Sequence, residues 1–389
     1  MFVNLEQMSN RERLTARVIY NGLGLPRTDG AVVVQGEGEG ATIVSLESLA
    51  DSRYKFPNTP ERHVGFALSP APVNAHTRLD LSTMPFSPGP YESFLPKVVT
   101  HSQVGGRGLA AAEGGLAQLE KLGTTVIGDV VTDEAVMRLL LESDFQGVAY
   151  WEVIGANPDE ADAIFNETVE TLRGFKRLER PGGMKVGLAP HTPHTVSTPL
   201  LQKLAALAGQ NKLPLQIHLA ETPGEIAMHK DGTGPLMELC RPFIPQWTPS
   251  GLSPVQYLKS LGVLDASPTL IHMVHVTGED VRDVQKAGCV VVHCPRSNEA
   301  LACGRFPWEL YAKHGVSVAL GTDGLGSSPT LSTEDEVKAA QAIHGDAASS
   351  QALVWSAVKG GYRALGMQPP QILKGNLLSK FHIWGEENP

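Results

Sequence analysis

The sequence has little of what marks secreted, membrane or nucleic-acid-binding proteins. It holds only four cysteines in 389 residues, without Cys-x-x-Cys spacing, which disfavours a disulfide framework or a thiolate metal site. Basic residues form no run longer than a pair and the net charge is −9, which argues against a nucleic-acid partner. No apolar stretch approaches a membrane span, and residues 1–13 lack a leader-like apolar core. We therefore expect a cytoplasmic protein that binds neither membrane nor nucleic acid.

Several catalytic signatures are also absent. The sequence contains no His-Glu-x-x-His, no Gly-x-Ser-x-Gly, no Walker loop and no cytidine-deaminase motif. The glycine-rich stretch Gly36–Gly40 carries two glutamates that would repel phosphate, so it is typical of a hairpin turn. These absences exclude most serine hydrolases, zincin proteases and P-loop enzymes.

What the chain does contain is a series of short apolar runs that end in potential metal ligands. Within Lys212–Thr222 a short apolar run ends in His218, and Glu221 follows three residues later. Such a run is typical of a buried strand. Three further runs end in the same way, at His76, His272 and Asp323. One histidine after an apolar run is more often a hydrogen-bonded core residue. Four such endings predict a shared site, because a parallel barrel brings the carboxyl ends of its strands to one mouth.

The order of strand and helix patterns predicts an α/β fold, a (β/α)₈ TIM barrel over residues 68–369. Residues 1–67 show short strands between glycine-rich turns and are expected to form a small β domain, to which residues 370–389 could return. Residues 231–253 hold several prolines, Pro242, Pro245 and Pro249 among them, and no clear period, so a loop insertion at the barrel mouth is expected. The eight expected strands end near His76, Asp129, Ile154, Pro190, His218, His272, His293 and Asp323.

At these residues the chain resembles the amidohydrolase superfamily, in particular its aminohydrolase and chlorohydrolase branch. Guanine, S-adenosylhomocysteine and aminodeoxyfutalosine deaminases belong to that branch. The resemblance covers roughly residues 14–366, and its segments follow in the family's order. They are Pro72-Val-Asn-Ala-His76-Thr, Gly123-Thr-Thr-Val, Ala189-Pro-His191, His218-Leu-Ala-Glu221-Thr, Leu270-Ile-His272-Met-Val-His275, His293-Cys-Pro-Arg-Ser-Asn298 and Leu320-Gly-Thr-Asp323.

The resemblance implies one divalent ion, zinc or iron, and a hydrolytic deamination. Its ligands would be His76, His218 and Asp323, with His272 as a further candidate. Asp323 would also accept a proton from the attacking water, Glu221 would carry that proton to the leaving group, and His272 would orient the hydroxide. His191 would line the substrate pocket, with His194 and Arg296 as further mouth residues.

The implied substrate is a small amino-substituted heterocycle of purine or nucleoside type. The same resemblance is compatible with a homodimer. A hydrolase of amide or carbon–halogen bonds on the same fold stays open as an alternative.

One residue departs from the family pattern. The first barrel strand of the family ends in His-x-His, whereas this chain has His76-Thr77-Arg78. Arginine stays protonated and offers no lone pair, so one ligand is lost and a cation is added. Strand residues two apart point the same way, so Arg78 is expected to aim at the site or to be displaced by a bulge. We expect a retained but weakened metal site. The alternative is a metal-poor homologue that binds a small molecule in the same pocket.

Overall fold

The computed structural model describes residues 10–385, which divide into two compact units. One unit comprises the described residues up to Pro72 together with those from Gln368 onward, and the other is Val73–Met367. The smaller unit therefore contains both ends of the described chain, and the larger one is continuous in sequence.

The smaller unit is built from two β-sheets. A four-stranded sheet has the order β4-β3-β1-β5, and a three-stranded sheet has the order β15-β6-β2, in which β15 and β6 are antiparallel. Apolar side chains of both sheets form one core that includes Leu14, Val32 and Phe381. The elements are β1 (Arg11–Thr15), β2 (Val18–Ile19), β3 (Gly30–Gln35), β4 (Thr42–Ser48), α1 (Leu49–Lys55), β5 (Glu61–His63), β6 (Ala67–Pro70) and β15 (Phe381–Trp384).

The larger unit contains eight parallel strands that close into a barrel, as the sequence predicts. Strands β7 to β10 form one parallel sheet and β11 to β14 form another. Two parallel bridges join these sheets, Leu188 with Leu215 and Thr77 with Asp323. The strands are β7 (Val73–Thr77), β8 (Val126–Val131), β9 (Gln146–Val153), β10 (Met184–Pro190), β11 (Gln216–Leu219), β12 (Thr269–His272), β13 (Val290–His293) and β14 (Ser317–Leu320).

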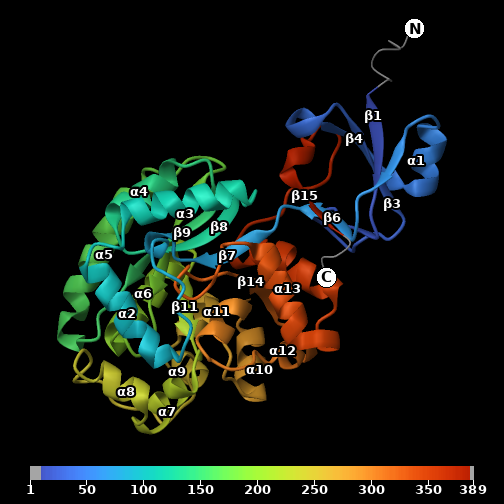
Figure 1. Ribbon diagram of the computed structural model, residues 1–389. Coiled ribbons are helices and arrows are strands. Elements are labelled where there is room, and N and C mark those ends of the chain that lie inside the picture. The colour runs from blue at the N-terminus through green and yellow to red at the C-terminus, as the bar shows by residue number, and fades with distance from the viewer. Residues whose placement is uncertain (1–9, 386–389) are drawn as a thin grey trace. The chain divides into compact units, whose positions relative to one another are not determined.

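Helices cover the outside of the barrel, which explains the nearly continuous apolar strands. Strand β13 reads Val-Val-Val-His and is buried at every position, because one face meets the barrel interior and the other meets helices. Figure 1 shows helices α3 and α4 outside strands β8 and β9. The main covering helices are α3 (Leu109–Lys121), α4 (Glu134–Glu142), α5 (Ala161–Lys176), α6 (Thr198–Asn211), α9 (Pro254–Ser260), α10 (Gly278–Lys286), α12 (Trp308–His314), α13 (Thr333–His344), α14 (Ser350–Trp355) and α15 (Gly361–Ala364).

Four further helices lie in segments that follow strand ends, and the sequence pattern did not indicate α2 or α8. Helix α2 (Tyr91–Gln103) contains Pro96 and buries none of its residues, so it shows neither an uninterrupted pattern nor an apolar core stripe. The segment expected as a loop at 231–253 includes α8 (Pro235–Cys240), whose proline lies in the first turn, where it needs no hydrogen-bond partner. The others are α7 (Pro223–Asp231) and α11 (Pro295–Ala300). No helix within residues 10–385 is long and apolar enough to cross a membrane.

Candidate active site

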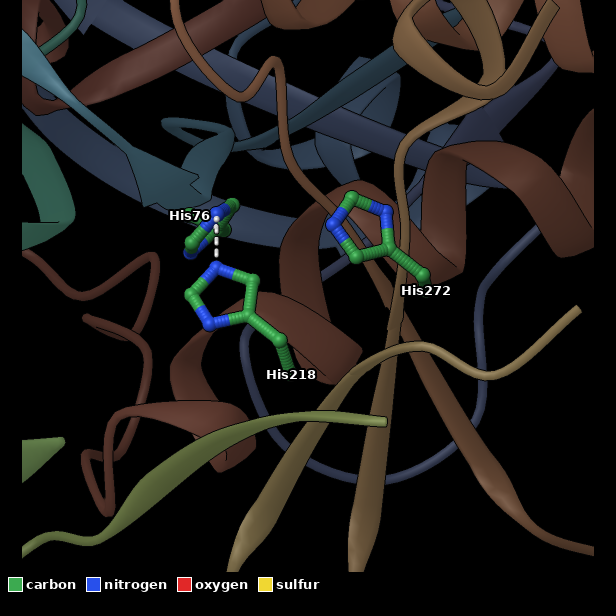
Figure 2. A group of neighbouring side chains, drawn as sticks. All are labelled: His76, His218 and His272. Carbon is green, nitrogen blue, oxygen red and sulfur yellow. Dashed lines mark hydrogen bonds between the residues drawn. The ribbon is translucent and has the colours of Figure 1, made fainter. Parts of the chain in front are cut away.

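The carboxyl ends of β7, β11 and β14 bring three potential metal ligands together. His76 Nε2 lies 3.3 Å from His218 Nε2 and 3.4 Å from Asp323 Oδ1. Figure 2 shows a ring nitrogen of His218 directed at the His76 ring, with the His272 ring beside them. All of these side chains are buried. Residues up to 247 positions apart in the chain (323 − 76) thus share one small volume, as the barrel prediction requires.

Hydrogen bonds on the far side of each ring set which nitrogen faces the centre. His76 Nδ1 lies 2.8 Å from Gln216 Oε1, and His218 Nδ1 lies 3.1 Å from the backbone oxygen of His191. Because amide and carbonyl oxygens only accept, both Nδ1 atoms carry the hydrogen and both Nε2 atoms present a lone pair to the centre. The other carboxylate oxygen of Asp323 accepts hydrogen bonds from two serine hydroxyls, those of Ser297 and Ser327, at 2.8 and 3.0 Å.

These separations fit one divalent ion. An ion with tetrahedral geometry and metal–nitrogen bonds of about 2.0–2.1 Å separates two of its nitrogen ligands by about 3.3 Å. Burial raises the pKa of Asp323, but its neighbours His76, His272 and Arg78 outweigh that effect and hold the pKa well below its usual range. Two imidazole lone pairs and an ionised carboxylate therefore converge, and the residues present fit a zinc-type ion with a position left open for water.

Sharp turns at the strand ends aim the remaining polar groups inward. Ala220, His272 and Asp323 adopt left-handed backbone conformations, with φ of 52°, 70° and 59°. Such conformations cost of order 1 kcal/mol or more for residues with a side chain and cluster at functional sites. The turn at Ala220 directs Glu221 toward the centre, where its Oε1 lies 3.5 Å from His272 Nε2 and 3.7 Å from Cys303 Sγ.

The two central carboxyl groups differ in protonation. Burial, and then the negative charges of Asp323 and Glu225, raise the pKa of Glu221 well above its usual range. Asp323 remains ionised, as described above. Burial lowers the pKa of His272 to about 3, so its imidazole is neutral. A protonated carboxyl and an ionised carboxylate in one pocket supply separate acid and base groups.

Arg78 points into this site, which is the first of the two arrangements that the sequence allowed for a residue two positions after His76. Its Nη2 donates to Glu152 Oε1 at 2.8 Å and lies 3.2 Å from His218 Nε2, while its Nε lies 3.9 Å from Asp323 Oδ1. Burial raises the pKa of Glu152, but Arg78 and then His191 reverse that effect and lower it to about 2. The guanidinium therefore forms an ion pair with Glu152 while touching a potential metal ligand.

A cavity of about 580 Å³ opens above these groups. Its polar floor includes Arg78, Glu152, His191, Glu221 and Asp323. Its walls are largely apolar and come from α2 and from the segment after α8, with Phe94, Leu95, Val98, Val99, Phe243 and Ile244 among the lining residues. The cavity therefore has charged side chains at its floor and apolar side chains along its walls.

Two of the expected mouth residues lie elsewhere. Neither His194 nor Arg296 lines the cavity. The Arg296 side chain donates instead to Glu336 Oε1 at 2.7 Å and to Thr330 and Ser332 at the start of α13. His194 is buried next to His229 rather than at the mouth. Both residues follow strand ends, but their side chains contact Glu336 and His229 outside the cavity, which strand position alone does not reveal.

Sequence reasoning missed two charged residues of the cavity. Glu152 is the single charged residue in the otherwise uncharged strand β9, and that isolated carboxylate was an available signal. Arg107 also lines the cavity and pairs with the buried Asp80 at 2.7 Å. Arg107 lies between α2 and α3, and no sequence pattern there indicates a site residue.

The barrel and its donor set define the class, a metal-dependent hydrolase with its site at the mouth of a TIM barrel. The chain belongs to the amidohydrolase family, whose profile matches residues 67–369. The predicted membership of this family, and of its deaminase branch, is thus confirmed, as is an enzyme that hydrolyses C–N bonds other than peptide bonds.

A relative agrees with this assignment, and solved structures agree with the fold. The chain is 41% identical over 381 residues to an aminodeoxyfutalosine deaminase of Deinococcus radiodurans, covering 95% of this chain and 90% of the relative. It is similar in fold to an aminofutalosine deaminase of Helicobacter pylori in complex with methylthio-coformycin, with a TM-score of 0.75, 21% identity and coverage of 94% and 90%. An adenosine deaminase of Xanthomonas campestris with bound zinc has a TM-score of 0.67, 25% identity and coverage of 94% and 82%.

Proposed function

We propose that this protein is a zinc-dependent deaminase of aminodeoxyfutalosine or of a closely similar purine nucleoside. The observation that carries the chemistry is the pair of oppositely tuned carboxyl groups, Glu221 and Asp323, which line the same cavity as His218, next to His76. The substrate is supported by the relative from Deinococcus radiodurans, which is similar over nearly the whole length of both chains.

In this proposal His76, His218 and Asp323 hold the ion, with His272 beside them. A bound zinc ion supplies a water molecule whose pKa is lowered to about 7 and which can therefore attack at neutral pH. Asp323 is ionised and can accept a proton at its carboxylate. Glu221 keeps its proton near neutrality and can donate it from its carboxyl group to the nitrogen that leaves as ammonia.

The remaining residues hold the substrate and exclude water. The neutral His272 Nε2 faces the same space as Glu221 Oε1, so it can orient the attacking oxygen. His191 lines the floor, where burial lowers its pKa to about 4 and keeps it neutral for hydrogen bonding to a heterocycle. The apolar walls from α2 and residues 243–244 suit a nucleoside that carries an apolar extension.

A second candidate function is binding of the same class of ligand without a metal. One observation favours it: the Arg78 guanidinium already lies 3.2 Å from His218 Nε2, where it can donate to the lone pair that a metal would use. Arg78 also brings a permanent positive charge into a buried site.

Metal analysis joined to a product assay tests both candidates. Purified protein would be measured for zinc and iron content and then assayed for ammonia release with aminodeoxyfutalosine, adenosine, 5′-deoxyadenosine and guanine. We expect about one catalytic zinc per chain and the highest kcat/KM with aminodeoxyfutalosine. Protein that binds the nucleoside but holds no metal and releases no ammonia would support the second candidate. Metal-dependent release from guanine alone would refute the proposed substrate.

A further inference from the structure

A second group of buried ligands lies apart from the proposed active site. The side chains of His194, Glu225 and His229 place one ligand atom each within 4.8 Å of one another. All three residues are buried, with exposures of 5%, 3% and 0%, and none lines the cavity described above.

The sequence builds this cluster from one helix and one loop. Glu225 and His229 are four residues apart in α7, so their side chains lie on the same face of the helix. His194 belongs to the segment between β10 and α6. Thr222 caps α7 by accepting a hydrogen bond from Glu225 N, which fixes the first turn that carries the carboxylate.

The two histidines of this cluster have unused polar atoms. Within the described part of the chain, neither Nδ1 nor Nε2 of His229 has a hydrogen-bond partner, and neither does His194 Nδ1. The His229 ring is enclosed by Trp247 and Tyr257, at centroid distances of 5.4 and 5.3 Å. A buried polar group without a partner costs about 1–3 kcal/mol, and native proteins retain few of them.

Both rings are also in the protonation state that a metal ion requires. Burial lowers the pKa of His229 to about 4, and burial followed by the charge of His229 lowers the pKa of His194 well below its usual range. At neutral pH each ring therefore has one nitrogen with a free lone pair.

The carboxylate of Glu225 can also bind a metal ion in addition to the hydrogen bonds that it accepts. Its Oε1 accepts a hydrogen bond from Ala220 N at 2.9 Å and its Oε2 accepts one from Glu221 N at 2.8 Å. Burial raises the pKa of Glu225 to about 7, and in the ionised form that binds a cation each oxygen keeps a second lone pair, because such a carboxylate can accept about four hydrogen bonds in total.

We propose that His194, Glu225 and His229 form a second, structural binding site for a divalent transition-metal ion of the zinc class. Two imidazoles and one carboxylate are a donor set that zinc accepts, and a water molecule can complete a tetrahedron. A tetrahedral ion separates its ligand atoms by about 3.3 Å, so binding draws the three side chains closer together.

The ion would stabilise the turn that carries Glu221. Glu225 holds the backbone N–H groups of Ala220 and Glu221, and Ala220 has the strained left-handed conformation. A carboxylate anchored to an ion at one side and to this turn at the other keeps Glu221 aimed at the active site. This role does not depend on whether the active-site ligands bind a metal of their own.

Zinc counting in matched variants tests the site. Wild-type protein, His229→Gln, His194→Asn and His76→Asn would be loaded with Zn²⁺, passed through a desalting column and analysed by mass spectrometry. His344→Gln is the matched control, because His344 is another buried histidine, next to His293 at 3.1 Å and far from this cluster in sequence. We expect His229→Gln and His194→Asn each to lose one zinc per chain and His344→Gln to lose none. The His76→Asn protein should retain the zinc of the second site.

Cobalt substitution in the His76→Asn background keeps the test valid if a single variant folds poorly. Co²⁺ at the second site should give visible d–d absorption bands, and EDTA should abolish them and lower Tm. Adding His229→Gln should remove the bands. Unchanged zinc content in both His229→Gln and His194→Asn would overturn the second site. So would a His76→Asn protein that takes up neither Zn²⁺ nor Co²⁺. Loss of zinc only on changing His76 would show that all bound metal belongs to the proposed active site.

Discussion

Replacing Arg78 by histidine is the sharpest perturbation that this structure offers. Arg78 lies two residues after His76 on the same side of the chain, and its Nη2 approaches His218 Nε2 to 3.2 Å. Arg78→His would remove a permanent cation from the donor set and add an imidazole in its place. Both changes act in the same direction, toward tighter binding of a divalent ion.

The expected gain in zinc affinity can be estimated from the charges and the distance between them. Two unit charges about 4 Å apart interact by about 4 kcal/mol at an effective dielectric constant of about 20, and the ion carries two charges. The ionised Glu152, whose Oε1 lies 2.8 Å from Arg78 Nη2, offsets part of this repulsion. A net difference of only about 1.4 kcal/mol changes affinity tenfold. We therefore expect Arg78→His to bind Zn²⁺ at least about ten times more tightly than the native protein.

Competition between each protein and a chromophoric chelator measures that affinity directly. Arg78→Met serves as one control, because it removes the charge without adding a ligand, and it should show part of the gain. Arg107→His serves as another, since Arg107 lines the same cavity but pairs with Asp80, and it should change zinc affinity little. If the native protein already binds Zn²⁺ as tightly as Arg78→His, Arg78 does not oppose the ion and the account of this site is wrong.

Three further changes have definite expected outcomes. Glu221→Gln should lower turnover by about two decades or more, as for a lost acid–base group, with Tm preserved; near-normal turnover would remove Glu221 from the mechanism. Glu152→Gln should remove the carboxylate to which Arg78 donates, leaving it the longer ion pair with Asp323 at 3.9 Å, and lower the free energy of unfolding by about 3 kcal/mol in denaturant titrations. Because the pKa of Glu152 is lowered to about 2, its stabilisation is present above its usual pKa of about 4.5 and is lost as pH falls toward 2, so the two proteins should converge in acid. Arg296→Met should destabilise the fold by depriving the buried Glu336 of its partner while leaving KM unchanged; a raised KM with normal stability would return Arg296 to the substrate site.

The amino-acid sequence by itself determined the architecture and the positions of the central residues. Apolar runs of strand length, alternating with helical patterns, predict a parallel barrel, because strands covered on both faces need such runs. His76, His218, His272 and Asp323 each lie at the end of such a run, and a barrel has only one mouth to which those ends can lead. Their convergence was therefore predictable from local patterns alone.

Only the tertiary structure decided which partner each side chain reaches. Glu152 is 74 positions from Arg78, yet it holds the guanidinium, and Gln216 orients His76 across 140 positions. Arg296 follows a strand end like the site residues, but Glu336 draws it away from the cavity. A strand pattern specifies the end at which a residue lies and the face from which its side chain leaves. It does not specify where a long side chain finds its counter-charge, because that depends on neighbours that only folding brings within hydrogen-bonding distance.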